Sequence, residues 1–449
     1  MPRLLCFVLA FRAIFSSNAD STHPQPLKFD LSPSSPDQIL QRYFSNEQLG
    51  QYLQNYAKRC SNISRLFSIG KSASGRWNLW ALEISNNPGT DEPKPYVKLV
   101  ANMHGNEPSG RQLLLQLAEE LCTRYSSDPE VASLVDGFHV MILPTMNPDG
   151  FERRMRPNIQ GKDLNRDFPD PIQAAMGRGW SDNLAPTGRE APETRAVMDW
   201  ARSHHFVAGV SMHEGAVVAN YPWDGSLDRR THYSASPDDA AFRHLATVYA
   251  QRNKDMAASK EFPGGVTNGA AWYPLYGGMQ DWNYLAADCM EITLELSQRK
   301  FPDKSLLPGL WEANRDALVA LLTAAAYGGA WGTVVGTAGG AEPTPLAAEI
   351  RVAGISKAIR ASRFGDFYRP LAPGNYTVTA SAAGYMAQSK EVAIPRDGSG
   401  ARLEFVLPSA GDRDLQGRAG GCGTAVPSTE AGEGGVPGPS CRGGESASA

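Results

Sequence analysis

Two histidines and one glutamate have the residue types and spacing of a metal site. His104 and Glu107 form an H-x-x-E pair directly after an apolar run, and His213 follows a second apolar run. Two imidazole nitrogens and one carboxylate are a ligand set for zinc, with a fourth position left for water. The pair alone is a weak signal, because a chain with eight histidines can contain H-x-x-E by chance. An isolated His104 fits a loop or core histidine as well.

Two neighbouring histidine patterns are poorer metal candidates. His213-Glu214 does not begin an H-E-x-x-H motif, because residue 217 is valine. The pair His204-His205 has no carboxylate at ligand spacing. It therefore fits the end of a helix better than a metal site.

A glutamate inside an apolar strand is a candidate general base. In residues 290–296 apolar and polar side chains alternate, which puts Glu291 and Glu295 on the same strand face. A glutamate at such a position is costly unless it is paired or functional, although an edge strand that exposes it fits the pattern too. Residues 153–156 read Arg-Arg-Met-Arg, a charge-rich run that, taken alone, fits a solvated loop.

These groups lie where the predicted elements end. Apolar runs predict strands, and apolar residues three or four apart predict helices. The strands are 96–101, 138–143, 206–212 and 290–296, and the helices are 113–121, 193–203 and 310–327. Their alternation predicts an α/β fold with a mixed, mainly parallel sheet covered by helices on both faces. Ligands collect at the carboxyl ends of such strands, where His104 and His213 fall.

The pattern of secondary-structure signals in the sequence changes near Gly328. Short strand signals and turns, without a long helix pattern, predict a small all-β sandwich after it. The first residues resemble a secretory signal, and the last are dominated by Gly, Ser, Ala and Pro. The predicted parts are a signal peptide at 1–19, a lead-in segment at 20–35, an α/β domain at 36–328, a β-sandwich at 329–408 and a disordered tail at 409–449.

Composition excludes several classes of protein. Lysine and arginine total 43 against 47 aspartate and glutamate, a net charge of −4, so the chain lacks the overall basic character of a nucleic-acid binder. No apolar run reaches about 18 residues, so no transmembrane anchor is expected. The six cysteines contain no C-x-x-C, which argues against a thiolate zinc site. Cys422 and Cys441 are candidates for a disulfide, and Asn62 and Asn375 begin glycosylation sequons.

Several longer motifs occur together and in order over roughly residues 36–408. They are SIGKS (Ser68–Ser72), HGNE (His104–Glu107), NPDGFE (Asn147–Glu152), DLNRDFP (Asp163–Pro169), ANYP (Ala219–Pro222), WYP (Trp272–Pro274), GGMQD (Gly277–Asp281) and EITLEL (Glu291–Leu296). In these motifs the chain resembles the zinc metallocarboxypeptidases of the N/E (regulatory) subfamily. The resemblance implies a metallocarboxypeptidase-like fold followed by a transthyretin-like β-sandwich, and an enzyme that removes C-terminal Arg or Lys from peptides and proteins.

The resemblance also implies which residues do the chemistry. His104, Glu107 and His213 would hold one zinc ion. Glu295 would be the general base, which activates water and passes a proton to the leaving amine. Arg156 would polarise the scissile carbonyl and stabilise the oxyanion.

Substrate recognition is implied in the same way. Asn165 and Arg166 would hold the free C-terminal carboxylate, which a planar guanidinium binds well, and Tyr273 would cap the bound peptide. Asp224 falls at the position that pairs with a C-terminal Lys or Arg side chain, and Gln280 would line the same pocket. Taken alone, Asp224 before a glycine also fits a turn.

Two glutamates are left without a catalytic role. Glu214 stands after the second histidine ligand, where subfamily members often have glycine. This difference bears on the pH dependence of the activity more than on its existence. Glu291 is interpreted as a structural or supporting residue.

Two other functions remain as alternatives. A non-catalytic module would grip peptide C-termini or present the β-sandwich to a partner, although the full set of implied residues argues against it. A zinc amide hydrolase acting on small N-acyl amino acids is disfavoured by the long chain and the appended β-sandwich. The signal predicts a secreted or secretory-pathway location. No pro-domain is visible between the signal and residue 36, so activation by cleavage is not expected.

Overall fold

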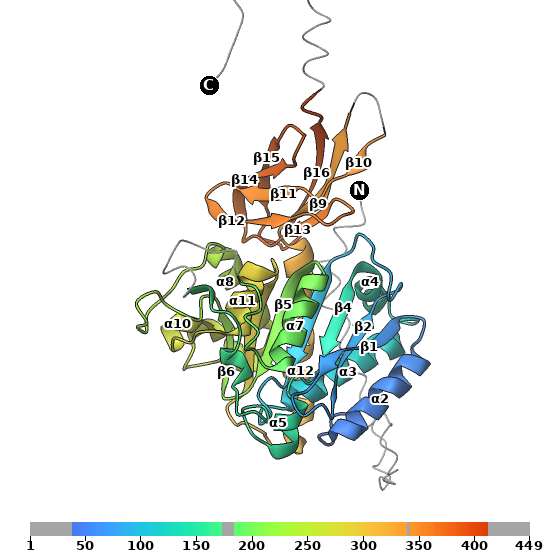
Figure 1. Cartoon of the computed structure of the whole chain (residues 1–449), viewed down its shortest axis with the longest axis vertical. Helices are drawn as coiled ribbons and strands as arrows, with labels where there is room; N and C mark the ends of the chain where they lie inside the picture. The colour runs from blue at the N-terminus through green and yellow to red at the C-terminus, as the bar shows by residue number, and fades with distance from the viewer. Residues whose placement is uncertain (1–37, 173–183, 339–341, 412–449) are drawn as a thin grey trace, which may run out of the picture.

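The structure is a computed structural model that describes residues 38–172, 184–338 and 342–411. Its α/β part holds the predicted strands and helices, and a smaller β part follows it in the chain (Figure 1). The predicted signal peptide and lead-in segment, and most of the predicted tail with Cys422 and Cys441, lie outside the described residues.

A mixed sheet forms the centre of the α/β part. Within the described residues it has eight strands in the order β1-β2-β4-β3-β5-β8-β6-β7. The strands are β1 (Ser64–Lys71), β2 (Asn78–Ile84), β3 (Tyr96–Ala101), β4 (His139–Leu143), β5 (Phe206–His213), β6 (Ala216–Tyr221), β7 (Val266–Asn268) and β8 (Met290–Ser297). The run β4-β3-β5-β8 is parallel, and β1, β2 and β6 add antiparallel pairs. The predicted fold class is confirmed.

Helices cover both faces of this sheet (Figure 1). Alternate residues of β3 enter two different cores: Val97 and Leu99 pack in one, Tyr96 and Val100 in the other. The first core is closed by α2 (Asn46–Arg59), α3 (Ser109–Arg124), α8 (Asp239–Arg252) and α12 (Leu307–Tyr327), and the second by α7 (Pro192–Ser203) and α11 (Met279–Ala286). Shorter helices are α4 (Pro129–Gly137), α5 (Pro148–Arg153), α9 (Lys254–Ala257) and α10 (Gly269–Trp272).

A disulfide between Cys60 and Cys122 joins the end of α2 to α3. The cysteine pattern did not predict this pair, because the two residues are 62 positions apart. Cys289 is a buried free thiol. In the described residues, no helix combines the length and the apolar character needed to span a bilayer.

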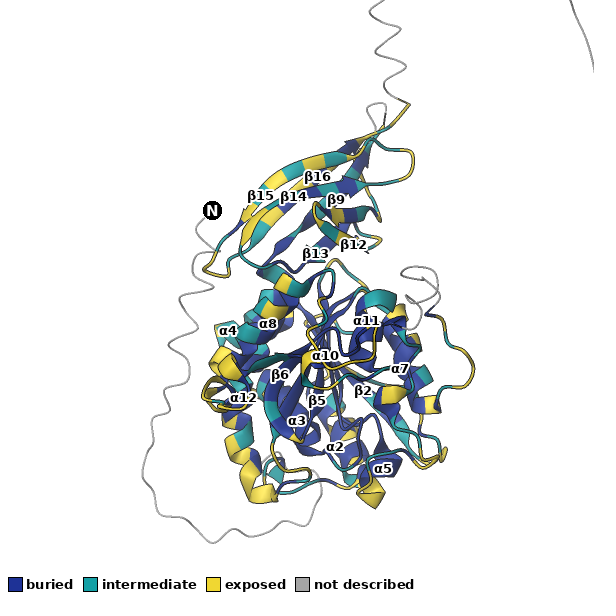
Figure 2. Cartoon of the chain, turned by 90° about the vertical axis from the view of Figure 1, so that its left-hand side faces the viewer, coloured by how far each residue is buried: buried dark blue, intermediate teal, exposed yellow. Residues whose placement is uncertain are grey.

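The β part consists of two small sheets packed face to face (Figure 2). One has β10 (Thr344–Pro345), β9 (Ala330–Thr337), β13 (Asp366–Arg369) and β16 (Ala401–Pro408), and the other has β12 (Ile355–Arg360), β11 (Glu349–Val352), β14 (Gly374–Ser381) and β15 (Gln388–Ile394). Apolar residues of both sheets, such as Val334, Phe405, Ile350 and Val378, form one core between them. This arrangement is consistent with the predicted β-sandwich.

Candidate active site

The carboxyl ends of three neighbouring parallel strands bring the predicted ligands together. Ala101 at the end of β3 pairs with Met212 of β5, and His213 pairs with Glu295 of β8. His104 lies shortly after the end of β3. Side chains that are far apart in the sequence therefore meet at one edge of the sheet.

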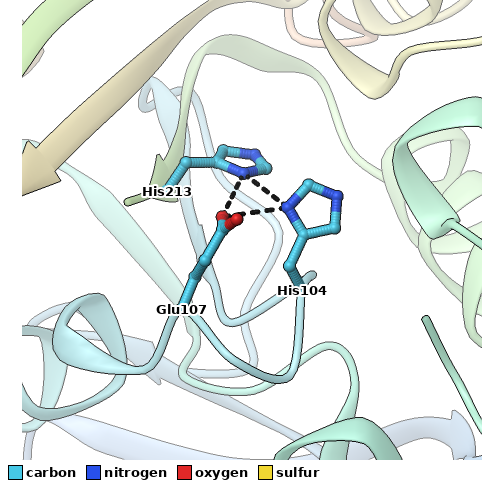
Figure 3. Close-up of side chains that lie close together, drawn as sticks. All are labelled: His104, Glu107 and His213. Atoms are coloured by element: carbon cyan, nitrogen blue, oxygen red, sulfur yellow. Dashed lines mark hydrogen bonds and ion pairs between the residues drawn. The ribbon is translucent and has the colours of Figure 1, made fainter. Parts of the chain in front are cut away.

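His104, Glu107 and His213 point toward one another in a buried cluster (Figure 3). Glu107 Oε2 lies 2.9 Å from Nδ1 of His104 and 3.0 Å from Nδ1 of His213, and the two Nδ1 atoms are 3.1 Å apart. No second group of metal-ligating side chains with comparable spacing occurs in the described part of the chain.

The donor set of this cluster fits a zinc ion. Donors bound at about 2.0–2.2 Å in a tetrahedral arrangement lie roughly 3.3 Å from each other, close to the separations in the cluster. The outer ring nitrogens are also held, since His104 Nε2 lies 3.0 Å from Asp163 Oδ1 and His213 Nε2 lies 2.9 Å from Ser211 Oγ. Such contacts fix the ring orientations and leave both Nδ1 atoms facing one point.

The glycine of the HGNE motif allows the ligand loop to approach a neighbouring helix closely. A Cβ at Gly105 would lie 2.0 Å from the carbonyl carbon of Gly150 in α5. The backbone N–H of Gly105 also donates to the carbonyl oxygen of Arg156 at 3.3 Å. The loop that carries His104 and Glu107 is therefore fixed by backbone packing.

Positive groups surround Glu107. Burial alone would raise its pKa, but the neighbouring imidazoles, that of His104 first, outweigh burial and keep the pKa of Glu107 well below its ordinary value. Its Oε1 also accepts hydrogen bonds from Arg156 Nη1 at 3.3 Å and Lys300 Nζ at 2.8 Å. Glu107 is therefore ionised, as a metal ligand must be.

Among the residues that the sequence prediction missed are two charged side chains that contact the histidine cluster, Asp163 and Lys300. Asp163 accepts from Arg156 Nε at 2.8 Å while it contacts His104, so it orients both side chains. Its place in the DLNRDFP motif was the available signal. Lys300 lies beyond the end of β8, and its presence in the site depends on how the chain turns after that strand.

Glu295 is buried, and no hydrogen bond from the described residues reaches its carboxylate. Its side chain lines the cavity, and its Oε2 has no hydrogen-bond partner among the described residues. Burial raises the pKa of Glu295 to about 7, although His213 opposes the shift. A carboxylate that titrates near neutrality beside a metal cluster can accept a proton and return it.

Most of the predicted site residues share one cavity. Its lining includes His104, Glu107, Arg156, Asn165, His213, Asp224, Tyr273 and Glu295. The other two predicted residues lie beside it: Arg166 is exposed next to Asn165, and Gln280 is buried behind Asp224. The fold thus brings all ten to one region, eight of them onto the cavity wall.

The residues predicted to hold a peptide carboxylate are oriented as donors. Asn165 Oδ1 accepts from the backbone N–H of Met279 at 3.0 Å, which leaves Nδ2 free to donate to a ligand. Arg166 donates from Nη1 to the backbone oxygen of Asn165 at 2.8 Å. Tyr273 is 42% exposed, so its ring is accessible from solvent.

Asp224 is a deeply buried charged group of the cavity wall. Its side chain is buried, and its Oδ1 accepts from Asn220 Nδ2 at 2.8 Å and from Gln280 Nε2 at 3.2 Å. Gln280 Oε1 accepts from the backbone N–H of Thr293 at 2.8 Å, which holds the amide in place. Glycine is required at residue 269, because a Cβ on Gly269 would lie 2.1 Å from Asp224 Oδ1.

A second buried carboxyl group lies directly behind Asp224. Burial raises the pKa of Asp224 to about 6, while the hydrogen bond from Asn220 and the charge of Arg166 oppose the shift. Asp281 accepts the backbone N–H of Asp224, and burial together with the Asp224 charge raises the pKa of Asp281 well above its ordinary value. Of the two, Asp224 carries the negative charge near neutral pH.

Glu214 turns toward the protein backbone. Its carboxylate accepts from the N–H of Ser109, the first residue of α3, and from the N–H of Phe301 at 2.7 Å. Burial raises the pKa of Glu214 to about 7 despite the bonds from Ser109. The side chain therefore links the start of α3 to the loop after β8.

A buried His-Glu-His cluster that could hold a metal ion lies beside a buried glutamate at one sheet edge, an arrangement that suits a metallopeptidase. The sequence profile described as "zinc carboxypeptidase" matches residues 49–317. The chain therefore belongs to the zinc carboxypeptidase family, and it is a metallocarboxypeptidase.

Comparison with similar proteins assigns the chain to one subfamily of the zinc carboxypeptidases. Carboxypeptidase SOL1 of Arabidopsis thaliana is 39% identical over 92% of this chain and 84% of its own length. Human carboxypeptidase D is 39% identical over 84% of this chain, which matches 27% of that longer protein. The carboxypeptidase N catalytic chain of Rattus norvegicus is 40% identical over 79% of this chain and 83% of its own length. The predicted resemblance to the N/E subfamily is confirmed.

Solved structures share the fold at lower identity. Carboxypeptidase A from Helicoverpa armigera has a TM-score of 0.52 and 21% identity, covering 64% of this chain and 74% of that one. Thrombin-activatable fibrinolysis inhibitor has a TM-score of 0.51 and 20% identity, covering 65% and 77%. At these identities the likeness supports the fold.

Proposed function

We propose that this carboxypeptidase removes Arg or Lys from the C-termini of peptides and proteins. Asp224 carries the proposal, because it is a buried carboxylate in the wall of the cavity that also holds the metal cluster. A guanidinium or ammonium group would pair with it through charge-assisted hydrogen bonds. An apolar terminal side chain would leave the buried charge without a cation.

The metal site of this function is assigned to the buried cluster. His104, Glu107 and His213 would be the ligands of one zinc ion, as their donor types and separations favour. Zinc bound there would act as a Lewis acid that could polarise a carbonyl group and lower the pKa of a bound water.

The remaining side chains divide the hydrolysis between them. Glu295 takes a proton from the attacking water and gives it to the leaving amine. Arg156 donates to the carbonyl oxygen while negative charge develops on it. Asn165 and Arg166 hold the terminal carboxylate, and Tyr273 covers the bound peptide at the cavity mouth.

Peptides that differ only in their last residue test the proposal. With C-terminal Arg, Lys, Leu or Phe, the enzyme should prefer Arg and Lys, and a chelator should abolish all hydrolysis. Asp224→Asn should lower kcat/KM for the Arg peptide by about 100-fold or more and leave the Leu peptide nearly unchanged. Asp228→Asn, which alters an exposed carboxylate bonded to His232, is the matched control. Equal losses on both peptides would contradict the pocket assignment.

We also propose a secreted or secretory-pathway location. The apolar start of the sequence, the Cys60–Cys122 disulfide and the exposed Asn62 and Asn375 of the sequons support it. Expression in a eukaryotic host should yield secreted protein that begins after residue 19. Retention of the uncleaved chain in the cytosol would contradict the proposal.

We also propose that the chain is divided into an α/β domain at residues 36–328 and a β-sandwich domain at residues 329–408. The end of α12 at Tyr327 and the start of β9 at Ala330 support this boundary. A catalytic function is preferred to a module that only binds peptide C-termini, because Glu295 lines the cavity beside the histidine cluster and no hydrogen bond from the described residues holds its carboxylate.

A further inference from the structure

One arginine of the β part is inserted into the α/β part. Arg369 in β13 donates from Nη2 to Asp238 Oδ1 at 2.7 Å, and both side chains are fully buried. Its Nε and Nη1 have no hydrogen-bond partner in the described part of the chain. Because burial of an ion pair costs much of what the pair gains, its presence is poorly explained by stability alone.

The ion pair continues into the α/β part through a tyrosine. Asp238 Oδ2 accepts from the hydroxyl of Tyr284 in α11 at 2.7 Å. The Tyr284 ring packs against the ring of Trp223, with 5.3 Å between the centroids. Trp223 directly precedes Asp224, so the contact reaches the residue beside the specificity carboxylate.

The same helix carries the groups that hold Asp224. Gln280 donates to Asp224 Oδ1, and Asp281 accepts from the backbone N–H of Asp224 at 3.0 and 3.1 Å. Gln280 and Tyr284 are four residues apart and lie on one side of α11. One buried helix therefore contacts the specificity carboxylate with its first turn and, through Asp238, the inserted arginine with its second.

We propose that Arg369 of the β part is a positioning residue for the specificity pocket. By fixing Asp238 and Tyr284, it sets the position of α11, and α11 presents Gln280 and Asp281 to Asp224. This inference rests on the proposed function, because it takes Asp224 as the group that binds a C-terminal Arg or Lys. It gives the β part a role in the choice of substrate.

A second ion pair crosses the same boundary without this connection. Arg363 of the β part lies 2.9 Å from Asp91, and both side chains are exposed. Asp91 lies in the loop before β3, away from α11 in the chain. Arg363→Met is therefore a matched control for Arg369→Met, with the same substitution and the same boundary.

Steady-state kinetics of the full-length enzyme on peptides ending in Arg and Leu test the inference. Arg369→Met should raise KM for the Arg peptide about fivefold, as expected for coupling through a packed network, with kcat within about twofold. The Leu peptide should change little, and Arg363→Met should match the wild type on both peptides. A purely structural role would lower the active fraction, so the rates on both peptides would fall together; that result would overturn the proposal.

A second variant keeps the test decisive if Arg369→Met does not fold. Tyr284→Phe retains the ring on Trp223 and removes the hydroxyl that joins Asp238. It should reproduce the rise in KM for the Arg peptide, and the double variant should be no worse than the single ones, because both act on one path. Unchanged preference in Tyr284→Phe would refute the inference.

The two proposals fail in different ways. A wild-type enzyme without preference for C-terminal Arg over Leu would remove the proposed function. A wild-type enzyme with that preference, retained in Arg369→Met and Tyr284→Phe, would remove the role of Arg369 alone.

Discussion

The two ends of strand β8 hold glutamates on the same face with different surroundings. At the first end, Glu291 forms a buried ion pair with Lys98 of β3 and accepts from Asn283 Nδ2 at 2.8 Å. At the other end, Glu295 is also buried but lines a cavity, and the described residues form no hydrogen bond to its carboxylate, whereas Glu291 lacks a partner only at Oε1. One end is compensated by the protein, and the other faces the cavity that also holds the histidine cluster.

The difference depends on a residue in the strand between β3 and β8. Gly209 of β5 has no side chain, and a Cβ there would lie 2.9 Å from Glu291 Oε2 and 3.2 Å from Lys98 Cγ. The glycine therefore lets the ion pair cross over β5. At the level of Glu295, β5 instead supplies His213. Burial alone therefore does not distinguish the two glutamates; Glu295 is the candidate catalytic carboxylate because it lines the cavity beside the histidine cluster and no side chain of the described residues is hydrogen-bonded to it.

Replacement of the unpaired glutamate should have the largest effect. Glu295→Gln removes the proposed proton acceptor, so kcat/KM on the Arg peptide should fall by roughly 10²–10⁴-fold, as measured by steady-state kinetics. The free energy of unfolding should stay equal or rise, because a buried and poorly paired carboxylate is replaced by a neutral amide. Near-normal turnover by this variant would contradict a catalytic role for Glu295, and the functional difference between the two glutamates would be lost.

The paired glutamate should affect stability instead. Glu291→Gln leaves the Lys98 ammonium buried without its anion, so the free energy of unfolding should fall by about 3–5 kcal/mol, as measured by chemical denaturation. Activity per folded molecule should remain close to that of the wild type. Replacing both partners, Lys98→Met with Glu291→Met, should recover much of the loss. A loss of turnover without a loss of stability would contradict the structural role of Glu291.

A smaller effect should appear when the pH is changed, because the preference for C-terminal Arg over Leu should weaken as the pH falls. Burial raises the pKa of Asp224 to about 6, so the carboxylate should be mostly ionised above that pH and mostly neutral below it. Because only the Arg peptide needs this charge, the ratio of kcat/KM for Arg to that for Leu should fall by about tenfold from pH 7 to pH 5. Taking the ratio cancels the titration of Glu295, which affects both peptides. If this ratio stays constant between pH 7 and pH 5, the charge of Asp224 does not determine the preference for C-terminal Arg over Leu.

Local signals in the sequence predicted the parts of the site that depend on one element. The apolar runs predicted β3, β5 and β8, and the period of two put Glu291 and Glu295 on one face. Strand ends at the carboxyl edge then placed His104 near His213. These predictions succeed because each rests on a periodicity or a junction that a short segment determines by itself.

Other features depend on segments that meet only in the folded chain. The pairing of Glu291 requires Lys98 from another strand, and the disulfide joins Cys60 to a residue of a different helix. Glu214 was expected to influence the pH dependence, and its contact with the start of α3 depends on the path of the loop at Phe301. Strand β1 at the sheet edge has a mixed polar and apolar pattern, so it had no clear signal.

The zinc content of purified enzyme tests the central claim most directly. Mass spectrometry of metals on wild type, Glu295→Gln and His213→Ala, at matched protein concentration, should give one zinc per chain for the first two. His213→Ala should retain less than about one tenth, because loss of one ligand from a three-residue set weakens binding strongly. Full zinc occupancy in His213→Ala, or wild-type enzyme that hydrolyses peptides without zinc, would contradict the account.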